Sequence, residues 1–398
     1  MNKYIFIIVL FFCFLNTAQA QSILGTVTSQ NAPLNGASVL WKNHGIGTIT
    51  NGEGKFALLL SKAVTPQDSI VFSCIGYAPF VISADEALKN KKLTVTLTAT
   101  ANNLSDVVVK NLSLAELLDS IENHNLKKFV SPAVLSGYYK EIVYSDTLCT
   151  EFSDALCEFY FNHNLNNKIQ LKINASRCLS STITNTWKER DSLKISPLSD
   201  IKPDKAFRYA LLYGMINRYF PKKILPYYKY KMEEDDNTIK ITIIPKKFDS
   251  KNHYVLTFFL TNDFTLQHYH LEIPDTVADM IRTVNLLGLH GKNMGFAIDV
   301  GYLENNGKIY PNSFFMQEIG RFWGKFFGTH IDQTFNQKSE FVITKVDDSK
   351  TVKPFDGSVT YSKGNICANG ISMNDSLLAN YNAILPTQTE RTIIKGMK

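Results

Sequence analysis

Short apolar stretches in which buried-type and polar residues alternate dominate the chain and predict β-strands. Within the first hundred residues we expect about seven of them, at 23–27, 37–41, 47–50, 55–60, 69–74, 78–83 and 93–98. Short strands at regular spacing with turn signals between them are typical of a β-sandwich. Gly52 and Gly54 suit a tight hairpin because glycine adopts positive φ at little steric cost.

Helical periodicity appears in two places. Over residues 113–129 an apolar stripe is made by Leu114, Leu117, Leu118, Ile121 and Leu126. Ser113 and Glu116 fit a capping box at the start of this helix. A second helix is expected over 204–219, ended by Pro221.

The remainder of the chain again favours strands, expected at 137–145, 151–161, 168–173, 237–244, 253–261, 265–273, 295–303, from 308 onward, and last at 339–345. A hairpin turn is expected at Asn262 and Asp263. We therefore predict a mainly β, α+β protein: an N-terminal β-sandwich followed by a larger antiparallel sheet domain with a few helices.

The expected domain boundaries follow from these patterns. They are a signal peptide at 1–20, the β-sandwich at 21–110, a linker helix at 111–130, the antiparallel α+β domain at 131–346 and an extended C-terminal tail at 347–398. One short helix is expected near Asp375, with regular structure ending around Pro386.

The N-terminus has the pattern of a secretory leader. Lys3 precedes a twelve-residue apolar run at 4–15, and Ala18 and Ala20 form an A-x-A site, which predicts cleavage before Gln21. The run is too short to span a bilayer, and Cys13 lacks the small preceding residue of a lipoprotein signal. We expect an exported, soluble protein of the periplasm or one associated with the outer membrane.

Four stretches in the first module resemble a known family. They are Asn-Gly-Ala-Ser-Val at 35–39, Gly-Thr-Ile-Thr-Asn-Gly-Glu-Gly-Lys-Phe at 47–56, Ser-Cys-Ile-Gly-Tyr at 73–77 and Leu-Ser-Asp-Val-Val-Val at 104–109. The module resembles the carboxypeptidase-regulatory-like domain, a transthyretin-like sandwich of exported Bacteroidetes proteins, including TonB-dependent receptors. The resemblance implies a non-catalytic accessory role. Asn51 stands where the family usually has Asp, and it can make the same local turn bonds.

A second resemblance covers the larger domain. Gly-Tyr-Tyr-Lys-Glu at 137–141 and the stretches 262–266 and 306–311 look like exported Bacteroidetes proteins that carry the same N-terminal module and an uncharacterised second domain. The expected curved sheet is similar to the half-barrels of periplasmic lipoprotein carriers. A TonB-dependent receptor is not expected, because a capped helix follows the module where the receptor plug would begin.

Charge and cysteine content narrow the class of protein. Lys and Arg number 42 against 36 Asp and Glu, a net charge of +6, and the basic residues are scattered, so no nucleic-acid partner is expected. Five cysteines remain after the leader: Cys74, Cys149, Cys157, Cys178 and Cys367. Their odd number and the absence of C-x-x-C argue against a disulfide framework. Cys149 and Cys157 either pair across a hairpin or remain free and buried.

The one candidate metal site is His268, His270 and Glu272, which share a face if they lie on a strand. Alternate residues on a strand are roughly 6–7 Å apart, which strains a single tetrahedral zinc site. We therefore expect a solvated polar set and assign no metal and no cofactor. No H-E-x-x-H, G-x-S-x-G or phosphate-loop motif is present, so no catalytic residue is assigned and no enzyme is expected.

A further motif places Gly320, Gly324 and Gly328 at four-residue spacing, interleaved with aromatic and basic residues: Arg321, Phe322, Trp323, Lys325, Phe326 and Phe327. Core packing of a loop that crosses the sheet is the simpler interpretation. The alternative is shallow contact with the outer membrane or with a partner.

These observations predict an exported, non-enzymatic envelope protein. The sandwich would dock, and the β-rich domain would bind an envelope protein or a hydrophobic ligand. One alternative is a periplasmic lipid or lipoprotein carrier, which needs an apolar cavity inside the curved sheet. The other is an unrecognised hydrolase, which needs a histidine, a carboxylate and a nucleophile that converge. The oligomeric state is not predicted.

Overall fold

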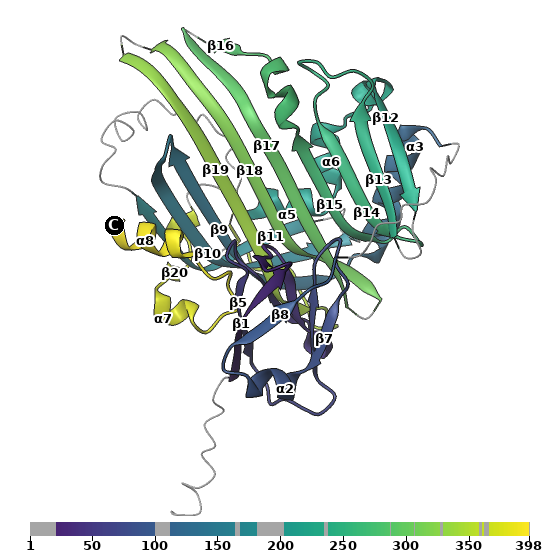
Figure 1. Ribbon diagram of the computed structural model, residues 1–398, viewed down its shortest axis with the longest axis vertical. Coiled ribbons are helices and arrows are strands. Elements are labelled where there is room, and N and C mark those ends of the chain that lie inside the picture. The colour runs from purple at the N-terminus through teal and green to yellow at the C-terminus, as the bar shows by residue number, and fades with distance from the viewer. Residues whose placement is uncertain are drawn as a thin grey trace, which may run out of the picture.

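The computed structural model of the protein describes residues 21–99, 112–163, 168–180, 203–234, 238–286, 288–305, 307–326, 329–357, 360–361 and 366–397. The expected signal peptide at 1–20, the stretch 104–109, Gly328 and Phe327 lie outside these residues. Within them the chain is mostly strand, and the predicted α+β class is confirmed (Figure 1).

The N-terminal module is a β-sandwich. One sheet has the order β2-β1-β5, with β8 pairing parallel to β1, and the other contains β4-β3-β6-β7. Its elements are β1 (Gln21–Ser29), β2 (Ala32–Pro33), β3 (Ser38–Trp41), η1 (Lys42–His44), β4 (Ile46–Ile49), β5 (Lys55–Leu60), β6 (Ser69–Ser73), β7 (Phe80–Ser83), α2 (Ala84–Lys89) and β8 (Leu93–Thr96). Alternate side chains from the two sheets meet in its core, where the rings of Phe56 and Phe72 lie 5.5 Å apart.

The turn before β5 uses Asn51 and Gly54 as expected, whereas Gly52 does not adopt positive φ. The side chain of Asn51 accepts hydrogen bonds from the backbone N–H groups of Glu53 and Lys55, both at 3.0 Å. Gly54 has φ of 70°, and a Cβ there would lie 2.5 Å from the carbonyl oxygen of Val27. Only glycine fits that position, so the hairpin is fixed by local chemistry.

The larger domain is built on one long curved sheet. Its elements are β9 (Ala133–Ser145), β10 (Leu148–Asn162), β11 (Lys168–Ser180), β12 (Tyr228–Glu234), β13 (Thr238–Pro245), β14 (Val255–Thr261), β15 (Leu266–Ile273), β16 (Val284–Leu286), β17 (Leu289–Asn305), β18 (Lys308–Phe326) and β19 (Thr329–Asp347). The order β12-β13-β14-β15-β17-β18-β19 continues into the sandwich through one pair, Lys345 with Ile46. β9 and β10 branch from β19.

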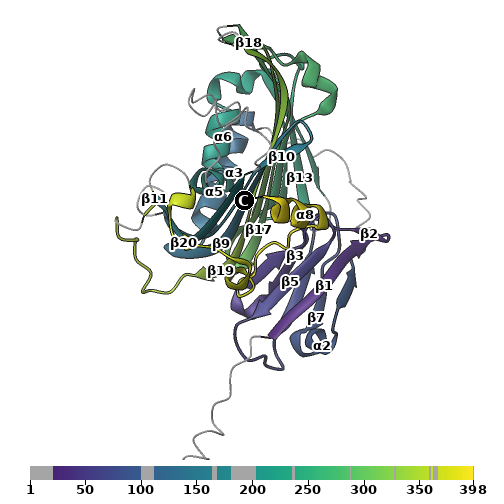
Figure 2. The same ribbon diagram turned by 90° about the vertical axis from the view of Figure 1, so that its left-hand side faces the viewer.

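Helices cover one side of this sheet, whereas the sandwich lies toward the other side at its lower end (Figure 2). They are α3 (Leu114–Lys128), α5 (Pro203–Ala210) and α6 (Tyr213–Tyr219). The 3-10 turn η3 (Lys222–Tyr227) follows α6, and η4 (Asp275–Met280) lies between β15 and β16 in the chain. The predicted capping box of Ser113 and Glu116 is confirmed. In the core the ring of Phe207 stacks on Phe159 at 4.6 Å. Helix side chains therefore occupy the concave face of the sheet.

The single helix expected over 204–219 is wrong. The chain breaks between α5 and α6, where Leu212 has φ of 69°. Leu211 and Leu212 are both buried, and consecutive residues of one continuous helix do not face the same neighbour. The break lets both leucines enter the core, so tertiary packing overrides the helical pattern.

The loop expected around Gly320 and Gly324 is also wrong, because both lie inside the long strand β18. Spacing of four residues places side chains on one face of a strand as well as of a helix. The glycine opposite, Gly291, makes room for the ring of Phe322, which a Cβ would approach to 2.8 Å. β19 likewise begins ten residues before the expected position.

The C-terminal segment is more ordered than expected. It contains η5 (Ile366–Ala368), β20 (Ile371–Ser372), α7 (Asp375–Leu378) and α8 (Gln388–Gly396). Regular structure does not end near Pro386, because Thr387 and Glu390 form a capping box that starts α8. The capping pattern was present in the sequence.

A disulfide joins Cys178 of β11 to Cys367, with 5.9 Å between their Cα atoms. Cys149 and Cys157 are free and buried, so the second of the two expected alternatives is confirmed. Both lie on β10, because the hairpin is at residues 146–147, ahead of them. Eight residues of strand hold them roughly 25 Å apart.

Candidate functional site

Strand β15 presents the three sequence-predicted polar residues on one face. Tyr269, Leu271 and Ile273 point into the core, so the alternation of a strand places His268, His270 and Glu272 on the opposite face. The sequence therefore predicted their common orientation.

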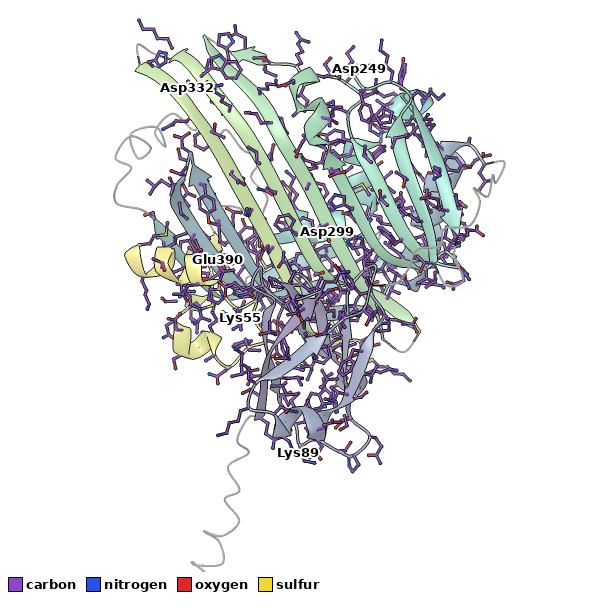
Figure 3. All side chains as sticks on the ribbon, viewed as in Figure 1. Lys55, Lys89, Asp249, Asp299, Asp332 and Glu390 are labelled. Atoms are coloured by element: carbon purple, nitrogen blue, oxygen red, sulfur yellow. A yellow bond between two sulfur atoms is a disulfide. The ribbon has the colours of Figure 1, made fainter. Side chains whose placement is uncertain are left out.

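An aspartate on the neighbouring strand β17 joins the two histidines. Asp299 pairs in register with His270. His268 Nε2 lies 2.8 Å from Asp299 Oδ1, and His270 Nδ1 lies 3.1 Å from Asp299 Oδ2. Glu272 Oε2 is 3.3 Å from His270 Nε2. Figure 3 shows Asp299 midway along the long strands.

These contacts set the charges of the group. Burial by itself raises the pKa of Asp299, but the hydrogen bonds from His268 and His270 outweigh it and hold that pKa below the usual 3.8. The hydrogen bond to Asp299 raises the pKa of His270 above 6.5, against the opposing effect of burial. The group is thus a linked ion-pair network.

The same contacts disfavour a metal ion bound by His268, His270 and Glu272. Across the part of the chain that the structure describes, no three His, Cys, Asp or Glu side chains are placed so as to hold a metal ion. Both ring nitrogens of His270 face carboxylates, and the carboxylate of Asp299 fills the space between the histidines. His268 and His270 come together as partners of Asp299, and Glu272 pairs with His270.

Cys74 is the nucleophile-type side chain that this group influences. It belongs to the loop after β6, and its thiol interacts electrostatically with the negative charge of Asp299. Burial, and to a smaller extent that charge, raise the pKa of the Cys74 thiol above 9.0. An activated cysteine has the opposite shift, because the thiolate is the nucleophile. At neutral pH this thiol is protonated.

A second polar group lies where α8 covers β9 and β19. Lys140 is only 4% exposed, and its Nζ lies 3.0 Å from Glu340 Oε2 and 2.9 Å from Glu390 Oε1. Burial by itself lowers the pKa of Lys140, but the two carboxylates raise it overall. The lysine therefore stays charged and binds the C-terminal helix to the sheet.

Next to it, Arg177 of β11 makes a two-pronged contact with Asp154 of β10, at 3.0 and 2.7 Å. The remaining nitrogen of Arg177 contacts Asp375 of α7 at 2.8 Å. Tyr138 donates to Asp154 at 3.1 Å. Bidentate Arg–carboxylate pairs are geometrically specific, so Asp154 orients Arg177, whose remaining nitrogen meets α7.

The same C-terminal segment also holds the sandwich. The side-chain amide of Asn382 donates to the carbonyl of Leu59 at 3.2 Å and its oxygen accepts from the N–H of Leu59. The amide of Asn51 donates to the carbonyl of Leu385 at 3.0 Å. We call residues 371–397 the C-terminal clasp, since they contact both the sandwich and the large sheet.

Sequence reasoning missed Asp299 and the clasp. The orientation of Asp299 could have been predicted, because it alternates with the buried residues Ile298 and Val300 on an expected strand. The partners of Lys140 could not have been predicted from the sequence, since Glu390 follows it by 250 residues.

Comparison with known proteins identifies the first module. Residues 23–109 match the family model described as CarboxypepD_reg-like domain. The expected resemblance of the sandwich is thereby confirmed, and we use this name for it below. The match covers the sandwich and leaves the large sheet domain unassigned. No curated protein matches the chain.

Among solved structures, one similar chain is lipovitellin, at 8% identity and a TM-score of 0.27, covering 65% of this chain and 29% of that chain. A LolA superfamily protein from Nitrosomonas europaea has 6% identity and a TM-score of 0.22, covering 62% and 97% respectively. A putative membrane-associated protein of unknown function from Bacteroides fragilis NCTC 9343 has 9% identity and a TM-score of 0.16, covering 82% and 98%. The chain thus spans less than a third of lipovitellin, and at these TM-scores none of the alignments establishes a shared fold.

Proposed function

We propose that this protein is an exported, non-catalytic envelope protein of Bacteroidetes type. Its CarboxypepD_reg-like domain docks an extended segment of another envelope protein, and its large sheet domain supports that interaction. The observation that carries the proposal is the exposed apolar edge of the sandwich at β7, where Val81 is 57% and Phe80 is 40% exposed.

β7 is the last strand in the order β4-β3-β6-β7. Val81 pairs with Val71 of β6 on one side, and among the described residues no strand pairs with its other edge. The bridge between Tyr77 and Ala99 ends before β7 begins. An edge strand offers a row of backbone N–H and C=O groups, and recognition by strand addition uses these together with alternate side chains.

The clasp fixes the sandwich that carries this edge. Asn382 and Asn51 tie the sandwich to the C-terminal segment, and Lys140 ties that segment to the large sheet. The disulfide of Cys178 and Cys367 anchors the chain just before the clasp. A binding surface that is already ordered loses less entropy on association.

Two observations favour this function over the alternatives. His268 Nε2 and His270 Nδ1 are both engaged by the carboxylate of Asp299, and the Cys74 thiol is protonated, which is unlike a hydrolase site. The concave side of the sheet is packed with helix side chains such as Phe207, where a lipid carrier needs open apolar space. Among the described residues no helix is both long and apolar enough to cross a bilayer.

The test is co-purification of the tagged full chain from a native envelope, comparing wild type with Val81→Lys. A lysine on an edge strand blocks strand addition. We expect wild type to retain a specific envelope protein and Val81→Lys to lose it, while Tyr227→Lys retains it. Tyr227 is a matched control because it is 58% exposed, like Val81 at 57%, but lies on η3 of the large domain.

Retention of the same partner by Val81→Lys would overturn docking through β7. Export is tested separately by N-terminal sequencing of the mature chain. We expect it to begin at Gln21, and an intact Met1 would contradict export.

A further inference from the structure

The ends of β16, β17, β18 and β19 form the extremity of the molecule that is farthest from the sandwich (Figures 1 and 2). Asp332 marks this end in Figure 3, and Lys89 of the sandwich lies at the other. We call it the strand tip and define it as residues 279–286, 288–294, 320–326 and 329–332. The proposed docking through β7 leaves the strand tip without a role.

Apolar side chains are exposed at the strand tip. Val284 of β16 is 63% exposed, Met280 at the end of η4 is 51% exposed and Met294 of β17 is 41% exposed. Three of the ten large apolar side chains that are exposed among the described residues thus lie in this one region. Exposed apolar residues that gather at one place mark interaction sites.

The strand tip is also positively charged. Its four cationic side chains are Arg282, Lys292, Arg321 and Lys325, against two carboxylates, Asp279 and Asp332. Both carboxylates are already paired: Arg321 contacts Asp332 at 3.0 Å and Lys292 contacts Asp279 at 3.5 Å. Within the described chain, Arg282 and Lys325 form no ion pair. The excess charge is therefore +2, and it is available to an outside partner.

An aromatic residue lies among these cations. The ring of Trp323 stacks on His290 at 5.5 Å, and the guanidinium of Arg321 lies 5.5 Å from the Trp323 ring centre. Trp323 pairs in register with Asp332. Tryptophan has an apolar body and a polar N–H, which suit the boundary between acyl chains and headgroups.

We propose that the strand tip docks the protein onto a phospholipid surface that carries anionic headgroups. The exposed apolar side chains enter the headgroup boundary, Trp323 lies at that boundary, and Arg282 and Lys325 face lipid phosphates. Apolar insertion and attraction between cations and anionic lipids are the two contributions that hold peripheral proteins on bilayers. This inference goes beyond the proposed function and does not depend on it, because vesicle binding needs no protein partner.

The test is co-sedimentation of the mature chain, residues 21–398, with vesicles of phosphatidylglycerol and phosphatidylethanolamine. Phosphatidylcholine vesicles, whose zwitterionic headgroups carry no net charge, serve as the comparison. Lys325→Glu should weaken binding to the anionic vesicles by about fivefold or more, since each cation near such a surface contributes about that factor. Lys91→Glu, an exposed lysine of the sandwich, should leave binding unchanged.

Insertion is tested by a second pair of variants and by fluorescence. Val284→Asp should reduce binding, whereas Ile371→Asp, equally exposed on β20, should not. Brominated lipids should quench the tryptophan emission of the wild type, and Trp323→Phe should abolish that quenching. Trp41 is fully buried in the sandwich, so it does not report on contact at the tip. Trp187, which lies outside the described residues, is replaced by phenylalanine in both proteins of this comparison.

Absence of vesicle binding, or binding that Lys325→Glu and Val284→Asp leave unchanged, would overturn the proposal. A change of oligomeric state in these variants, measured by light scattering without lipid, would assign the strand tip to a second copy of the chain. The vesicle-binding and light-scattering measurements both require folded variants, and circular dichroism checks their folding.

Discussion

Lys140 in β9 donates a hydrogen bond to Glu390 in α8, with 2.9 Å between Nζ and Oε1, although 250 residues separate them. The lysine is buried, and it also contacts Glu340. This hydrogen bond holds the C-terminal clasp on the large sheet. Because the clasp also contacts the sandwich, the same hydrogen bond helps to position the sandwich.

Replacement of Lys140 by methionine should destabilise the protein strongly. It leaves Glu340 and Glu390 close together and mostly buried without a cation, and breaking a buried ion pair costs about 3 kcal/mol or more of unfolding free energy. Chemical denaturation of Lys140→Met measures this. Lys89→Met, which removes an exposed pair with Asp85, should change stability little; equal effects of the two variants would contradict the structural role of Lys140.

Asn125 should be the most sensitive polar residue of α3. Its amide donates to the carbonyl of Phe264 at 3.0 Å, and its oxygen accepts from the N–H of Leu266 at 2.7 Å. Asn125→Ala leaves both backbone groups without a partner and should cost about 2–4 kcal/mol. Asn123→Ala, at an exposed position of the same helix, should cost less than about 0.5 kcal/mol. A small effect at Asn125 would show that the helix is not fixed to the β14–β15 turn.

The group around Asp299 predicts a pH dependence of stability. The pKa of His270 is raised when folded, so its contribution is complete below about pH 6.5 and is lost as pH rises through the folded pKa. The pKa of Asp299 is lowered when folded, so its contribution is present above about pH 4 and is lost as pH falls. The group therefore stabilises the folded protein most between about pH 4 and about pH 6.5.

Asp299→Asn should accordingly lower Tm most near pH 5–6, within the window set by those two groups, and the difference from wild type should shrink toward pH 8. NMR titration should also show the pKa of His270 falling in this variant. Asp85→Asn in α2 is the control and should give a difference that does not vary with pH. A pH-independent loss in Asp299→Asn would mean that the aspartate acts only by packing.

The disulfide gives a chemical prediction. Alkylation of the denatured, unreduced chain from Gln21 onward should label Cys74, Cys149 and Cys157, and digestion should yield one bridged peptide that contains Cys178 and Cys367. Cys367→Ser should lower stability by about 2–5 kcal/mol and expose the clasp to proteolysis. A bridged peptide containing Cys149 and Cys157 would contradict the structure.

Features with a local cause could be predicted from the sequence. The capping box of Ser113 and Glu116, the turn bonds of Asn51 and the common face of His268 and His270 all depend on residues within four positions of each other. Each follows from helix or strand periodicity and from side-chain hydrogen bonding.

Features that depend on partners distant in the chain could not be predicted from the sequence. The break at Leu212 follows from burial of two adjacent leucines, and the bond from Cys178 to Cys367 spans 189 residues. The long strand around Gly320 was missed because a four-residue spacing fits a strand face as well as a helix. The candidate site was half predicted: His268, His270 and Glu272 could be placed on one face, but the strand that supplies Asp299 could not be paired with theirs.

The most direct test of the account is site-specific photo-crosslinking from the β7 edge in the native envelope. A photoreactive residue at position 81 should give a discrete adduct with one envelope protein, while the same residue at position 371 should give none. Mass spectrometry should place the crosslink in an extended segment of the partner. Absence of an adduct at 81, or equal adducts at both positions, would contradict docking through the CarboxypepD_reg-like domain.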